Sequence, residues 1–72
     1  MMSVTIKQHK TDDYYVTLEI ENRYGNNIYV VQVCPCYKNS DLCGYPIKEI
    51  SYSNSEKQKA LATYRRYVKK YC

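Results

Sequence analysis

The chain has 72 residues, ten tyrosines but no phenylalanine or tryptophan, and a formal net charge of +4. This length fits one domain, residues 1–72, and leaves no room for a second. The first residues contain no apolar run of signal-peptide type, and no segment approaches the roughly 20 apolar residues that cross a bilayer. We therefore expect a cytoplasmic chain that does not bind membranes, whose four cysteines are reduced thiols or ligands.

The first part of the chain has two segments with the pattern of β-strands. Residues 4–8 suggest a short strand, and the polar residues 10–13 form a turn after it. From 14 to 21 apolar and polar side chains alternate, which is typical of an antiparallel strand with one buried face. The expected outer face of this strand carries Tyr15, Thr17, Glu19 and Glu21. We expect the two glutamates to be exposed, solubilising charges.

Two further strands are expected in the middle of the chain. Turn residues at 25–27 precede an almost continuous apolar run at 28–34. This run is short and β-branched, which predicts the central strand of the sheet, with either face as the buried one. Pro35 either ends regular pairing or forces a bulge, because proline has no N–H for the ladder. After a loop, residues 45–52, with Pro46 near their start, fit a weaker edge strand.

The last segment, residues 54–71, is predicted to be an amphipathic helix. Ser53 and Glu56 have the spacing of a capping box, with Ser53 as the N-cap. Six residues fall within an arc of roughly 120° at helical periodicity and form the expected inner face: Ala60, Leu61, Tyr64, Tyr67, Val68 and Tyr71. Three to four antiparallel strands followed by this helix predict an α+β fold, a β-meander with the helix packed on one face.

The excess positive charge lies in this last segment. Residues 1–56 carry five basic and seven acidic side chains, whereas residues 57–72 carry six basic side chains and no acidic one. The negative end of the helix dipole explains Lys69 and Lys70, but it explains Lys57 near the helix start less well. Such asymmetry indicates an acidic partner, either nucleic acid or an acidic protein surface. The candidate partner-binding residues are Lys59, Arg65, Arg66, Lys69, Lys70 and Tyr67.

The strongest chemical pattern is the pair Cys34 and Cys36, two residues apart, with Cys43 seven residues further on. Three thiols, with Cys72 or His9 as a fourth ligand, are soft ligands of the kind that a tetrahedral zinc ion prefers. A single tight pair departs from the paired knuckles of structural zinc sites, so we expect no metal or other cofactor. A zinc-stabilised domain is an alternative, and so is a disulfide between Cys36 and Cys43 in an oxidising setting.

No catalytic pattern accompanies these cysteines. The sequence has no P-loop, nucleophile elbow or H-E-x-x-H motif, and its two glycines cannot form a phosphate-binding loop. A chain of this length rarely forms the concave pocket that catalysis requires. We therefore expect a binding protein rather than an enzyme.

Residues 50–60, which run into the Tyr-Arg-Arg-Tyr segment 64–67, resemble the strand-then-helix endings of small phage and prophage proteins. Anti-CRISPR and other anti-defence inhibitors belong to this group. The resemblance rests on size and on lysine and tyrosine content, and it carries over no functional residue. It implies a compact binder that blocks a larger host machine. Many such inhibitors are acidic DNA mimics, and this basic chain departs from that pattern.

The expected function is that of a small non-enzymatic binding protein, of the phage-encoded inhibitor type. Its expected partner is a larger host protein or nucleoprotein complex, which it binds as a monomer or homodimer. The alternative is a nucleic-acid-binding module that uses the basic helix. The tyrosines favour a protein partner, because tyrosine is enriched in protein interfaces, although A/T-rich codon usage explains their number equally well.

Overall fold

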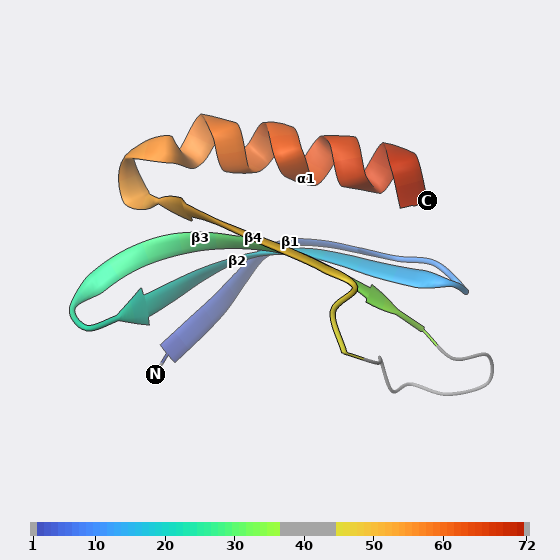
Figure 1. The fold of residues 1–72 in the computed structure, drawn as a ribbon, viewed down its shortest axis with the longest axis horizontal. Helices are drawn as coiled ribbons and strands as arrows, with labels where there is room; N and C mark the ends of the chain where they lie inside the picture. Colours follow the sequence, from blue (N-terminus) through green and yellow to red (C-terminus); the bar gives the residue numbers. More distant parts are fainter. Residues whose placement is uncertain (1, 37–44, 72) are drawn as a thin grey trace.

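A computed structural model of the chain describes residues 2–36 and 45–71 (Figure 1). Its elements are β1 (Met2–Lys10), β2 (Tyr14–Arg23), β3 (Asn26–Pro35), β4 (Lys48–Ser53), a short 3-10 helix η1 (Asn54–Glu56) and α1 (Lys57–Tyr71). In the described ranges the strands form one antiparallel sheet in the order β1-β2-β3-β4, and α1 lies across one face of it. This architecture confirms the predicted α+β meander with a C-terminal helix.

A tight turn joins β2 and β3. Every residue of β2 pairs with one of β3, so only Tyr24 and Gly25 lie outside the ladder. Both have a positive φ, 53° and 80°, as a type I′ hairpin turn requires. Glycine adopts this conformation readily, whereas it is uncommon for a tyrosine. The turn predicted at 25–27 is therefore shifted, because the two asparagines that suggested it already belong to β3.

The fourth strand is shorter than the strand predicted at 45–52. It begins at Lys48, and its ladder with β3 runs from Lys48 to Ser53. Pro46 has no N–H to donate, which limits how far the ladder can extend toward the loop. The Ile47 N–H still donates to the carbonyl oxygen of Val33 at 2.8 Å. The strand lies at the edge of the sheet, as predicted.

The hydrophobic core lies between α1 and the two central strands. Its buried members are Val16, Leu18, Val31, Val33, Ala60 and Tyr64. Val16 lies opposite Val33 and Leu18 opposite Val31 in the register of β2 and β3. The four strand side chains are at most 1% exposed, and burial of each stabilises the fold by about 1.5–3 kcal/mol. The sequence left undecided which face of β3 is buried, and the structure shows that the helix covers the face with Val31 and Val33.

The other face of the sheet has no second layer within the described residues, yet its side chains are less exposed than predicted. Val30 is 0%, Thr17 4% and Glu21 8% exposed. The Glu21 carboxylate forms an ion pair with Arg23 at 2.7 Å, which compensates its charge where water is scarce. The prediction that both glutamates are exposed is therefore wrong for Glu21, and Glu19 is half-buried.

Glu19 lies near two further carboxylates on this open face. Burial raises the pKa of Glu19 above its ordinary value, and the negative charges of Glu21 and Glu49 raise it further. The folded state thus binds this proton more tightly than the unfolded chain does. The stabilisation that results is present at low pH and is lost as the pH rises through the pKa of the folded state. Three carboxylates, those of Glu19, Glu21 and Glu49, therefore lie near one another on the opposite side of the sheet from the basic helix.

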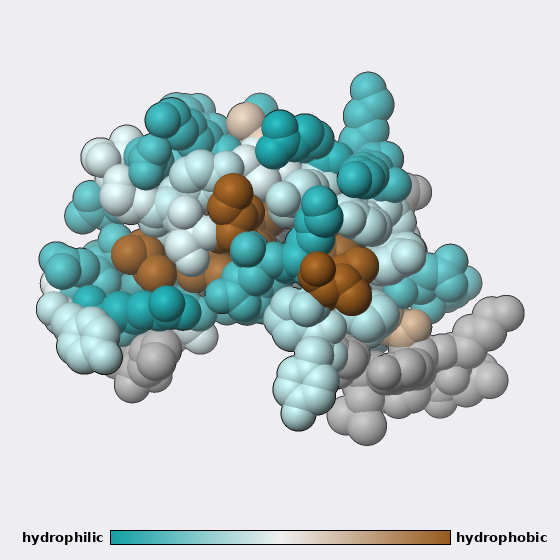
Figure 2. Space-filling view, in the orientation of Figure 1, coloured by the Kyte–Doolittle hydropathy of each residue, from teal (hydrophilic) through white to brown (hydrophobic). Residues whose placement is uncertain are grey.

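Hydropathy differs between the outside of the helix and its junction with the sheet. Figure 2 shows hydrophilic side chains over α1 at the top of the view and apolar patches where the helix meets the strands. No helix in the described ranges is long and apolar enough to span a membrane.

Candidate functional site

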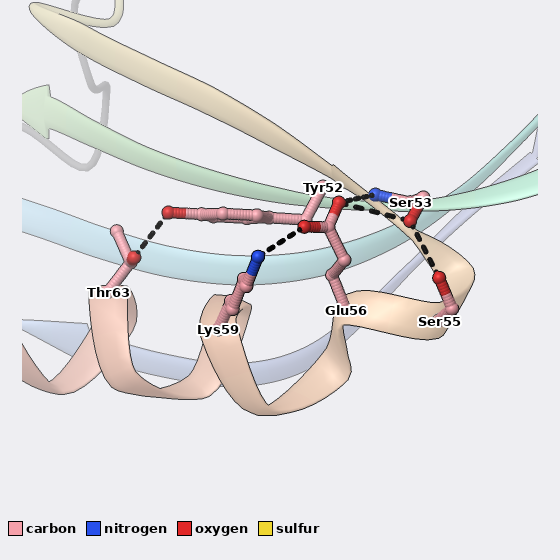
Figure 3. A network of polar contacts seen from close by, with 6 residues as sticks. All are labelled: Tyr52, Ser53, Ser55, Glu56, Lys59 and Thr63. Atoms are coloured by element: carbon pink, nitrogen blue, oxygen red, sulfur yellow. Dashed lines mark hydrogen bonds and ion pairs between the residues drawn. The ribbon is translucent and has the colours of Figure 1, made fainter.

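The start of the helical segment is held by a group of polar contacts (Figure 3). The Glu56 carboxylate accepts hydrogen bonds from the Ser53 backbone N–H at 3.2 Å and from Ser53 Oγ at 3.0 Å. It also forms an ion pair with Lys59 at 3.0 Å. The hydrogen bond from Lys59, followed by those from Ser53, lowers the pKa of Glu56 below its ordinary value. These contacts confirm the predicted capping box at Ser53 and Glu56.

A hydrogen bond between two hydroxyl groups shows which flank of α1 lies toward β4 (Figure 3). Tyr52 Oη on β4 and Thr63 Oγ1 on α1 lie 2.6 Å apart and share a hydrogen bond. Thr63 is only 4% exposed, so loss of this bond leaves a polar group buried without compensation. The flank of α1 that carries Thr63 therefore faces β4.

Three tyrosines pack together beneath the last turns of α1. The Tyr71 ring lies edge-on to the Tyr14 ring, with 5.1 Å between centroids, and edge-on to the Tyr67 ring, with 6.1 Å. Aromatic pairs in this geometry contribute about 0.5–1.5 kcal/mol beyond the area that they bury. All three rings are half-buried and pack against the core. They therefore belong first to the fold.

Cations lie close to two of these rings. The Arg66 guanidinium is 5.8 Å and the Lys48 ammonium 6.0 Å from the centroid of Tyr67, and the Lys70 ammonium is 5.5 Å from that of Tyr71. These distances are within the range of a cation–π attraction. A nucleic-acid base that stacked on either ring would have to displace these cations.

Lys48 was not among the predicted binding residues. It lies opposite Val33 in the ladder of β3 and β4, and therefore on the face of the sheet that carries α1. Lys48 and Ile50 are two residues apart, so in a strand they lie on the same face of the sheet. The sequence could place Lys48 on that face only if β4 was known to include it.

The outer side of α1 is a cluster of cations. We call Arg65, Arg66, Lys69 and Lys70 the basic outer face, and all four are exposed. Arg65 and Lys69, and likewise Arg66 and Lys70, are like charges four residues apart, an arrangement that destabilises an isolated helix by about 0.2–0.5 kcal/mol per pair. Lys69 and Lys70 lie in the last turn, where the helix dipole offsets this cost; the two arginines lie before it.

The remaining predicted binding residues have other contacts. Lys59 is bound to Glu56, and Tyr67 is half-buried in the aromatic group. In the part of the chain that the structure describes, the ion pairs are Arg23 with Glu21 and Lys59 with Glu56. The structure thus brings the four cations of the basic outer face together and leaves their charge uncompensated by any described carboxylate.

The cysteine pattern is only partly within the described residues. Cys34 and Cys36, near the end of β3, are both half-buried. Cys43 and Cys72 lie outside the described residues, and so do, as complete groups, the zinc site and the Cys36–Cys43 disulfide that the sequence left as alternatives. Among residues 2–36 and 45–71, no three histidine, cysteine or acidic side chains are close enough together to hold a metal ion.

Comparison with known proteins identifies no relative. No protein-family model, curated protein or solved structure matches this chain.

Proposed function

We propose that this chain is a small non-enzymatic binding protein that docks its basic outer face onto an acidic surface of a larger protein. The observation that carries the proposal is the uncompensated charge of Arg65, Arg66, Lys69 and Lys70. Their spacing costs helix stability and contributes nothing to the core. A partner that supplies carboxylates accounts for such an arrangement, because it turns the repulsion into attraction on binding.

The proposed mode of action, to block a site on a larger protein, is compatible with the small size of the molecule. The Cα radius of gyration is 12.2 Å, so the chain can cover one site on a larger protein and hinder access to it. The resemblance to phage-encoded anti-defence inhibitors supports this role as a blocker of a host protein or nucleoprotein complex. A protein partner is favoured over single-stranded nucleic acid, because the packed Tyr67 and Tyr71 rings offer no open stacking platform.

The test is reversal of the four charges. The Arg65→Glu, Arg66→Glu, Lys69→Glu, Lys70→Glu variant should keep its circular-dichroism spectrum, since exposed charges contribute little to stability. It should lose a partner that the original chain recovers from nuclease-treated lysate. A double variant, Arg66→Glu with Lys69→Glu, is matched in charge by Lys10→Glu with Lys57→Glu, two exposed residues outside the basic outer face.

The matched pair separates local contacts from net charge. The first double variant should bind the partner much more weakly, and the second about as well as the original chain. Equal loss in both would show that only net charge matters and would contradict the proposal. Two results together would establish the nucleic-acid alternative instead. The chain would bind oligonucleotides with an affinity that falls with salt, with a slope of about 0.9 per phosphate contact for duplex DNA on logarithmic scales. It would also recover no protein partner after nuclease treatment.

A further inference from the structure

One helix covers only part of the sheet. Four strands about 4.8 Å apart form a face wider than a single helix, whose diameter is about 10 Å. α1 packs against β2, β3 and β4, and the outermost strand β1 lies beyond it. Every residue of β1 from Ser3 to Lys10 is exposed, and Val4 is 61% exposed.

The helix and β1 together border an apolar region. Thr63 faces β4 through its hydrogen bond to Tyr52, and at about 100° per residue Leu61 and Val68 lie on the opposite flank of α1, toward β1. Both are half-buried. On the sheet, Val4 pairs with Ile20, which alternation places on the face that α1 covers. We call Val4, Ile20, Leu61 and Val68 the uncovered strip.

The two elements that border this strip carry charged side chains of one sign. Neither β1 nor α1 contains an acidic residue. Lys7 pairs with Leu18, so it lies on the same face of the sheet as the core. Arg65 follows Leu61 by one helical turn and is exposed. An element that covered the strip would therefore meet apolar side chains together with Lys7 on β1 and Arg65 on α1.

We propose that the uncovered strip binds an amphipathic α-helix of the partner protein, with an apolar stripe toward the strip and acidic side chains along its flanks. This deepens the proposed function, on which it rests, by naming the element of the acidic partner that docks. β1 is about 30 Å and α1 about 22 Å long, so a helix of about four turns can lie beside α1 over β1.

The alternatives fit the strip less well. An added β-strand would have to pair with the free edge of β1, where a bulge between Thr5 and Lys7 interrupts the register. Bulges and edge lysines such as Lys7 and Lys10 hinder pairing of this kind. The helix that a second copy of the chain would offer, its own α1, has basic exposed charges, which would repel Lys7 and Arg65.

The experiment uses synthetic helical peptides of 15 residues as probes. The first has a leucine stripe flanked by glutamates, the second has lysines in place of the glutamates, and the third has the composition of the first in scrambled order. Binding is measured by titration calorimetry, and the site by NMR chemical-shift changes of the full chain. We expect only the acidic amphipathic peptide to bind. Its binding should change the NMR chemical shifts of β1 and of the flank of α1 that carries Leu61 and Val68.

Two matched variants test the location. Val4→Glu places a carboxylate in the strip and should weaken binding of the acidic peptide by about tenfold or more, because the buried charge is left unpaired. Ile47→Glu changes an apolar residue that is 52% exposed outside the strip and should leave affinity within about twofold. Both side chains are exposed, so both variants should fold. Equal affinity of the three peptides, or an unchanged affinity of Val4→Glu, would overturn the inference.

A second comparison separates this inference from the proposed function. Arg66→Glu with Lys70→Glu alters the basic outer face away from β1, and this variant should still bind the peptide. Suppose that this variant lost peptide binding and that, in the original chain, the peptide shifted only signals from the outer side of α1. The inference about the strip would then be overturned, while the proposed function would remain intact. A chain that dimerises in solution and becomes monomeric on Val4→Glu would make a second copy the occupant and would also overturn the inference.

Discussion

Valines in neighbouring strands of this sheet have opposite surroundings. Val16, Val31 and Val33 are 0% exposed, whereas Val4 is 61% exposed. All four belong to the same continuous antiparallel ladder. The difference arises because α1 packs over β2 to β4 and a single helix is narrower than the sheet. Backbone pairing therefore places a side chain on a face, and on this face the layer formed by α1 removes it from water.

The largest expected effect is on stability in the covered half. Leu18→Ala should lower the free energy of unfolding by about 2–5 kcal/mol, because it removes buried methyl groups and leaves a cavity under α1. Val4→Ala should change it by less than about 0.5 kcal/mol, as for other exposed positions. Urea denaturation of both variants measures the difference. Similar losses would show that β1 is covered in solution and would break the comparison.

The next effect concerns the bond that holds α1 toward β4. Tyr52→Phe should cost about 1–3 kcal/mol, because the Thr63 hydroxyl stays buried without its partner. Thr63→Val, which keeps the shape of the side chain, should recover part of this loss when combined with Tyr52→Phe. A double-mutant cycle measured by urea denaturation gives the coupling between the two hydroxyls. Strictly additive losses would mean that the bond does not set the position of the helix.

The smallest effect is on the capping box and depends on pH. The folded-state pKa of Glu56 is lowered from the ordinary value of 4.5. The stabilisation from this carboxylate is therefore complete above its unfolded pKa and is lost as the pH falls through the folded one. Glu56→Gln should lower the thermal midpoint at neutral pH, and this effect should disappear as the pH falls below the folded-state pKa of Glu56. A loss of stability that was the same at every pH, including strongly acidic pH, would show that the ionised carboxylate is not what caps the helix.

Local patterns were enough to predict most of the fold. The alternation at 14–21, the β-branched run at 28–34 and the capping box at Ser53 and Glu56 all became the elements expected of them. The boundaries of these elements differ from the predicted ones where a local turn signal competes with pairing between strands. The asparagines after Gly25 are good turn residues, but the β2–β3 ladder includes them. Pro46 removed a donor that a longer β4 would need.

The candidate site was predictable in part. The cations of the basic outer face could be found because helical periodicity alone turns them away from an apolar stripe. Lys48 could not, since its place near Tyr67 depends on the register of β4. The ion pair that lets Glu21 be buried beside Arg23 was likewise invisible, because an alternating pattern assigns a side chain to a face but not to a degree of burial.

By itself the sequence determined the meander, the amphipathic helix and the separation of positive charge into the last segment, because each follows from contacts within a few residues of one another. Only the tertiary structure decided which face of β3 is covered, that β1 stays exposed beside α1, and that the flank with Leu61 and Val68 lies toward β1. These features depend on where one helix lies across four strands, and that position results from packing between residues far apart in the chain.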